Sequence, residues 1–132
     1  MAAVMVDTSA IFALLDRSDR NHVQAVRILQ RLAKDKEGVL LTNFILAETH
    51  ALVLARLGAE MARAWLQNLR WPVERVSAVD EERARAIICT FTDKEFSYTD
   101  ATTFAIMERL NLEYAFSFDR HFRQFGIRLL KD

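Results

Sequence analysis

The stretch YTDATTFAIMERLNLEYAFSFD, residues 98–119, predicts a helix that leads directly into a buried strand. Ser97 and Asp100 form the S-x-x-D pattern of a capping signal, so we expect a helix at the start of this stretch. The apolar run at 114–118 then predicts a strand, which stops at Asp119. Because a carboxylate buried alone is costly, we expect this strand to end at an open edge that a cation can reach.

The rest of the chain alternates strand and helix patterns in the same way. Further strands are expected at 3–6, 39–42, 73–76 and 127–130, and helices at 10–15, 22–36, 44–57, 59–69, 81–91 and 98–110. We expect Thr8–Ser9, Asn43 and Asp80 to cap the helices that follow them. This alternation indicates one α/β domain over residues 1–132, with parallel strands and helices on both faces of the sheet.

Composition limits the function classes. With 132 residues, 52% of them hydrophobic, the chain can bury one full core. Basic and acidic residues number 18 each, so nucleic-acid binding must rest on a local site and not on overall charge. The single cysteine, Cys89, excludes an internal disulfide and fits a cytoplasmic location, and we expect it in the core. No run approaches about 20 uncharged apolar residues, so no membrane span is expected.

Acidic residues follow two of the predicted strands at the point where each strand ends. Asp7 comes directly after the run at 3–6, and Asp119 comes after the run at 114–118. Because ligands of open α/β sheets bind outside the carboxyl ends of the strands, we expect both acids in one crevice. Asp100 lies in the first turn of its helix, and we expect that turn to face the same edge of the sheet.

Glu48 is a fourth acid that we expect near this edge. It lies one turn into its predicted helix, between apolar positions. Taken singly, each of the four acids has an ordinary explanation as a turn former, a helix cap or a solvated side chain. Together, four carboxylates raise one another's pKa values, and a divalent cation removes that conflict. Oxygen ligands without a cysteine or histidine pair favour Mg²⁺ or Mn²⁺ over Zn²⁺.

Three blocks of the chain resemble the PIN domain family, and in particular its VapC type of toxin ribonuclease. They are VMVDTSAIFALLD (4–16), TNFILAETHAL (42–52) and FSYTDATTFAIMERLNLEYAFSFDRHFRQFG (96–126), in the order of the family. The resemblance implies a three-layer α/β/α sandwich with a mainly parallel central sheet, and a metal-dependent endoribonuclease. The residues that match its site are the catalytic acids Asp7, Glu48, Asp100 and Asp119, with metal at Asp7, Asp100 and Asp119, and the supporting hydroxyl residues Thr8, Ser9 and Ser117.

The same resemblance implies partners for the chain. These are an RNA substrate, a small antitoxin protein of a toxin–antitoxin pair, and a second copy of the chain in a homodimer. The segment 51–69 is a candidate surface for either protein partner, because it has more large apolar residues than one helix face needs. Basic residues that we expect to hold RNA phosphates are Arg17, Arg20, Arg120 and Arg123. The roles of Asp93 and His121 stay open.

Two other functions fit parts of the pattern. A non-catalytic RNA-binding or assembly module of the same fold is the alternative, and the presence of all four acids weighs against it. A phosphoryl-accepting receiver domain also has Asp at strand ends. Such a domain would require an acidic pair after the first strand and a Lys after a late strand. Here Asp7 is followed by the residues TSA, and the stretch FSFD at 116–119 contains no Lys.

Overall fold

Short apolar runs form the strands, since strands of a parallel sheet covered by helices are buried on both faces. The computed structural model describes residues 3–132, so the first two residues of the expected 1–132 domain lie outside the described residues. The strands are β1 (Val4–Val6), β2 (Val39–Thr42), β3 (Val73–Glu74), β4 (Tyr114–Phe116) and β5 (Arg128–Leu129). They form one sheet in the order β3-β2-β1-β4-β5, and every pair is parallel. The predicted parallel sheet is confirmed.

The central strand β1 fixes the position of the site. All three of its residues are buried, and Met5 pairs with Leu40 of β2 on one side and with Ala115 of β4 on the other. From β1 the chain winds outward through β2 and β3, and then returns to place β4 and β5 on the opposite side. The winding order therefore reverses between β1 and β4, and a ligand crevice is expected outside their carboxyl ends.

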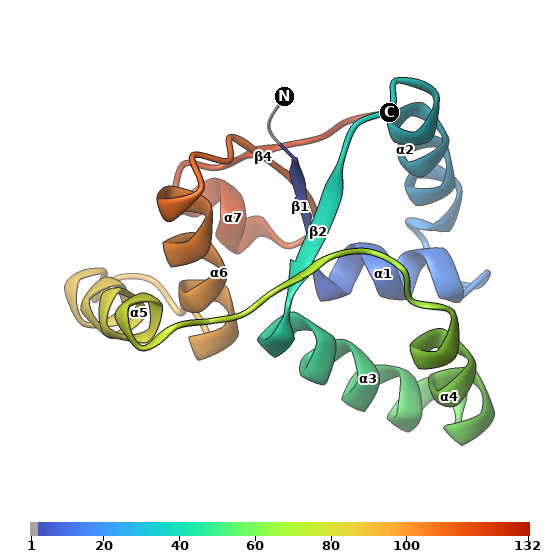
Figure 1. Ribbon diagram of the computed structural model, residues 1–132, viewed down its shortest axis with the longest axis horizontal. Coiled ribbons are helices and arrows are strands. Elements are labelled where there is room, and N and C mark those ends of the chain that lie inside the picture. Colours follow the sequence, from blue (N-terminus) through green and yellow to red (C-terminus); the bar gives the residue numbers. More distant parts are fainter. Residues whose placement is uncertain (1–2) are drawn as a thin grey trace.

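Helices cover both faces of this sheet. In Figure 1, α5, α6 and α7 lie on one side of the strands, and α1, α2 and α4 lie on the other, whereas α3 extends beyond the carboxyl end of β2. Their bounds are α1 (Thr8–Leu15), α2 (His22–Lys34), α3 (Asn43–Leu57), α4 (Ala59–Asn68), α5 (Ala78–Thr90), α6 (Tyr98–Arg109) and α7 (Arg120–Gln124). The expected three-layer α/β/α arrangement is confirmed. Within residues 3–132, no helix has the length and apolar character needed to cross a membrane.

Helix α6 is held firmly at the end that carries Asp100. Every residue from 101 to 107 is buried, and the ring of Phe104 stacks on that of Phe125 with centroids 4.6 Å apart. At its first turn the predicted capping box is present: Asp100 N donates to Ser97 Oγ at 3.0 Å, and Ser97 N donates to Asp100 Oδ2 at 3.2 Å. Packing and capping together fix where the Asp100 carboxylate lies.

Three helix caps differ from the sequence prediction. They are Asp7 in place of Thr8–Ser9 for α1, Thr42 in place of Asn43 for α3, and Ser77 in place of Asp80 for α5. Each observed cap has the extended backbone that lets its side-chain oxygen accept from the first turn, whereas each predicted one already lies within the helix. Asn43 Oδ1 instead accepts from Val76 N at 2.8 Å, which ties α3 to the segment after β3.

Three further expectations are wrong in detail. The strand expected at 114–118 ends at Phe116, because the buried hydroxyl of Ser117 turns to Asp7. Cys89, expected in the core, is exposed, because α5 is an outer helix that buries only its other face against α6. The strands at the two edges of the sheet are also shorter than predicted.

Candidate active site

Two serine hydroxyls join the ends of β1 and β4. Asp7, the residue after β1, is only 6% exposed. Its Oδ2 accepts from Ser117 Oγ at 2.7 Å, and its Oδ1 accepts from Ser9 Oγ at 2.8 Å. The same hydroxyl oxygens accept from the backbone beyond β4, Ser117 Oγ from Asp119 N at 2.9 Å and Ser9 Oγ from Phe118 N at 2.8 Å. The two strand ends, and the acid that follows each, are thereby held in register.

The buried Asp7 and the partly buried Asp100 resist ionisation. Burial raises the pKa of Asp7 from 3.8 to about 7, although the hydrogen bonds from Ser117 and Ser9 oppose the rise. Burial also raises the pKa of Asp100, and the negative charge of Asp119 raises it further. A bound cation would stabilise the ionised form of both groups, so the electrostatics of the edge suit a positively charged ligand.

Glu48 reaches the same edge from α3. It is exposed, although it lies between apolar positions of the helix, and its Oε1 accepts from Thr8 Oγ1 at 2.6 Å. Thr8 Oγ1 in turn accepts from the buried Thr49 at 3.0 Å. Among residues 3–132, the second carboxylate oxygen of Glu48, Oε2, has no hydrogen-bond partner.

A cavity of about 420 Å³ is lined by all four predicted acids, Asp7, Glu48, Asp100 and Asp119.

Three of the lining residues have the donor atoms of a divalent metal site. A carboxylate oxygen of Asp100, one of Asp119 and a ring nitrogen of His121 all lie within 4.8 Å of one another. Asp7 is outside this close group, and its oxygens already accept from two hydroxyls and from Ala10 N. Two carboxylates are ligands that Mg²⁺ and Mn²⁺ accept, so the residues present fit the expected ion.

Comparison with known proteins identifies the family. A sequence model of the PIN domain matches residues 4–127. The chain belongs to the PIN domain family. It is 35% identical over 127 residues to the "23S rRNA-specific endonuclease VapC20" of Mycobacterium tuberculosis, covering 93% of this chain and 94% of that protein. The resemblance to VapC-type PIN proteins is thereby confirmed.

Solved structures of proteins with the PIN fold are also similar to this chain. The crystal structure of Mycobacterium tuberculosis VapC20, described as a sarcin–ricin loop cleaving toxin, superposes with a TM-score of 0.87 at 31% identity, covering 98% of this chain and 100% of that one. VapBC2 from Rickettsia felis, solved bound to a DNA fragment from its promoter, gives a TM-score of 0.75 at 15% identity, with 98% of each chain covered. The latter similarity concerns the fold alone.

The other charged residues singled out in the sequence lie outside the cavity of this PIN domain. The arginines predicted to bind RNA phosphates are all exposed, and they lie after α1 or in the short helix α7; they are Arg17, Arg20, Arg120 and Arg123. Asp93 is exposed, pairs with Lys94 at 2.9 Å and is not among the residues that line the cavity. His121, by contrast, lines the cavity, and the spacing Asp-x-His at the start of α7 is the sequence signal that could have assigned it there.

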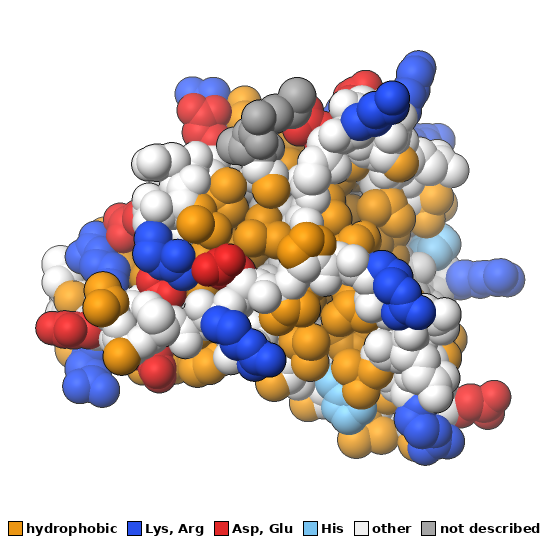
Figure 2. Space-filling model, in the orientation of Figure 1, with side chains coloured by type: hydrophobic (Ala, Val, Ile, Leu, Met, Phe, Trp, Pro, Cys, Tyr) orange, Lys and Arg blue, Asp and Glu red, His pale blue; other side chains and the backbone are white. Residues whose placement is uncertain are grey.

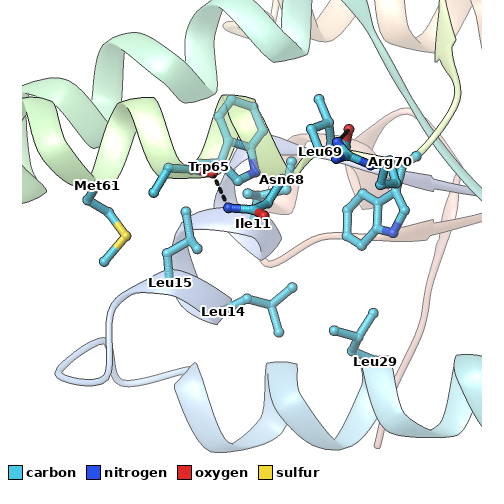
Figure 3. A pocket seen from close by; sticks show the side chains of 11 residues that line it. Ile11, Leu14, Leu15, Leu29, Met61, Trp65, Asn68, Leu69 and Arg70 are labelled. Atoms are coloured by element: carbon cyan, nitrogen blue, oxygen red, sulfur yellow. Dashed lines mark hydrogen bonds between the residues drawn. The ribbon is translucent and has the colours of Figure 1, made fainter.

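An apolar groove between α1, α2 and α4 is a separate hollow of this PIN domain (Figure 3). It has a volume of about 430 Å³, and its walls include Leu14, Leu29, Met61 and Trp65. Figure 2 shows hydrophobic side chains across the middle of one face of the molecule, with basic and acidic side chains both among them and at the periphery. Within the segment 51–69, expected to be an apolar surface, the large apolar residues differ in exposure: Val53 is buried, Leu52, Leu57, Trp65 and Leu69 are partly buried, and Leu54, Met61 and Leu66 are exposed.

Proposed function

We propose that the protein is a metal-dependent endoribonuclease that hydrolyses RNA phosphodiester bonds. The observation that carries the proposal is the convergence of Asp7, Glu48, Asp100 and Asp119 on one open cavity, two of them with raised pKa values. The relative VapC20, 35% identical over nearly its whole length, is named an endonuclease specific for 23S rRNA. That RNA is therefore the first substrate to test, and we propose a cytoplasmic location, where such a substrate would be found.

The chain's own residues have distinct parts in this reaction. Asp100 and Asp119 would hold Mg²⁺ or Mn²⁺, and Asp7, oriented by Ser9 and Ser117, would complete the negative field around it. When bound, the ion lowers the pKa of a water molecule and neutralises charge that develops on the phosphoryl oxygens. Glu48, held through Oε1 by Thr8, lines the cavity, where its carboxylate can accept a proton from the attacking water.

Cleavage of defined RNA tests this proposal. The purified protein is incubated with a 23S rRNA fragment and with a mixed RNA pool, in Mg²⁺, in Mn²⁺ and in chelator. We expect cleavage only with metal, and a loss of at least about a hundredfold in Asp100→Asn, because a group that stabilises the transition state is removed. Asp93→Asn, which changes an exposed acid outside the cavity, is the matched control and should cleave normally.

The alternative, a non-catalytic RNA-binding module, predicts a different result in the same experiment. RNA would be retained by the protein, and no metal-dependent products would form. Cleavage that persists unchanged in Asp100→Asn would show that another site or a contaminant is responsible. Substitution of Arg120 and Arg123 by Gln should weaken RNA binding in either case, since exposed guanidinium groups hold phosphates.

We further propose that a small antitoxin protein binds the apolar groove and that two copies of the chain form a homodimer. The groove lies between three helices and presents mostly apolar walls, which is the surface that an amphipathic helix recognises. If this is right, Leu14→Asp should escape inhibition by a co-expressed antitoxin while keeping its cleavage activity. Analytical ultracentrifugation that detects only monomer at micromolar concentration would refute the proposed homodimer.

A further inference from the structure

His121 is held directly over the acids of the site. Asp119 caps α7, and its Oδ1 accepts from His121 N at 2.9 Å, which places the imidazole on the cavity side of the first turn. The ring meets that of Phe96 edge-on, with centroids 5.9 Å apart and an interplanar angle of 88°. Backbone and packing therefore both restrict where this ring lies. Its Nδ1 is 2.9 Å from Asp119 Oδ1 and 3.4 Å from Asp100 Oδ2.

The Nδ1 atom is buried and makes no hydrogen bond within the described part of the chain. Its contact with Asp119 is short, yet it lacks the alignment of a hydrogen bond. Buried polar atoms nearly always have a partner, because an unpaired one loses the free energy of hydration. A cation between the ring nitrogen and the two carboxylates would supply that partner. His22, whose Nδ1 contacts Ala13 O at 2.7 Å, has its partner in the protein and gives a useful contrast.

The distances suit ligands of one ion. Two atoms bound in adjacent positions of an octahedral ion, each at about 2.1 Å, lie about 3.0 Å apart. The separations of His121 Nδ1 from Asp119 Oδ1 and from Asp100 Oδ2 are close to this value. We propose that His121 Nδ1 is a direct ligand of the divalent ion and that it makes the site prefer Mn²⁺ over Mg²⁺. This inference rests on the proposed metal-dependent function and extends it to a nitrogen ligand.

The metal preference follows from ligand chemistry. Mg²⁺ binds oxygen and gives up its water ligands reluctantly, whereas imidazole nitrogen suits first-row transition ions. A site built only from carboxylates has no such bias. The competing explanation is that His121 is a charged imidazolium that pairs with Asp100 and Asp119 and leaves when the ion binds. It predicts no bond between nitrogen and metal.

Pulsed electron paramagnetic resonance of the Mn²⁺-loaded full chain distinguishes the two. We expect ¹⁴N modulation of the Mn²⁺ spin echo in the wild type, and its replacement by a ¹⁵N signal when only histidine is ¹⁵N-labelled. The modulation should vanish in His121→Asn and persist in His50→Asn, because His50 lies on α3 outside the cavity. The labelled wild type tests the proposal even if the first variant folds poorly.

Binding measurements by calorimetry supply the second readout. Loss of even an outer-shell partner typically weakens metal binding about tenfold, so His121→Asn should weaken Mn²⁺ binding by at least about tenfold. Mg²⁺ affinity should fall much less, and the preference for Mn²⁺ should disappear. Mn²⁺ binding without ¹⁴N modulation, or equal losses for both ions, would overturn the nitrogen ligand and leave the acidic site standing. Failure of the wild type to bind either ion would instead refute the proposed metal-dependent function and this inference with it.

Discussion

Asp7→Asn should stabilise the metal-free protein at alkaline pH while abolishing its cleavage activity. Burial raises the pKa of Asp7 from 3.8 to about 7. One pKa unit corresponds to about 1.4 kcal/mol, so ionising this group in the folded state costs at most about 4 kcal/mol. Because relaxation and water entry offset part of such costs, we expect Asp7→Asn to raise the free energy of unfolding by about 2 kcal/mol at pH 8. This is a large fraction of the roughly 5–15 kcal/mol of a typical domain.

The sign of the pH dependence follows from linkage. The folded-state pKa of Asp7 lies above its unfolded value, so the folded protein binds the proton more tightly. The stability that this proton contributes is fully present below about pH 4 and is lost as the pH rises toward 7. The asparagine variant carries no such group, and its advantage over the wild type should therefore grow across this window.

Urea unfolding in chelator at pH 4.5 and pH 8 measures the effect. We expect a small difference between wild type and Asp7→Asn at the lower pH and the full difference at the higher one. Asp93→Asn is the matched control, because it removes an exposed acid whose pKa is lowered by Lys94, and it should change stability little. An Asp7→Asn advantage of equal size at both pH values would refute the reasoning, since the gain would then not come from ionisation.

Three further outcomes are expected from the structure. Arg109 lowers the pKa of buried Asp80, so Asp80→Asn should cost about 2 kcal/mol at pH 7, and the deficit in urea unfolding should shrink as pH falls through that lowered pKa. Ser117→Ala removes a hydrogen bond that opposes the rise in the pKa of Asp7, so Mn²⁺ binding should shift to higher pH in calorimetry. Leu14→Asp should leave RNA cleavage unchanged and abolish protection by an antitoxin in a growth assay.

Local patterns determined the elements of this fold. Strand runs end at Asp7 and near Asp119, and the capping box of Ser97 and Asp100 begins α6 as predicted. These features depend on residues only a few positions apart, so their periodicity and hydrogen bonding can be predicted from the sequence. The caps of α1, α3 and α5 lie one to three residues before the predicted ones, because several nearby polar side chains are able to accept the same backbone hydrogen bonds.

The sequence by itself determined the α/β class, the parallel strands and the four acids that belong to one edge of the sheet. Only the tertiary structure placed β4 beside β1, so that Ser117 bonds Asp7 from 110 positions away. It also turned Glu48 to the cavity through Thr8 and brought the ring nitrogen of His121 to within 3.4 Å of Asp100. Such contacts join distant segments, and their geometry is set by how helices and strands pack together, which no local pattern encodes.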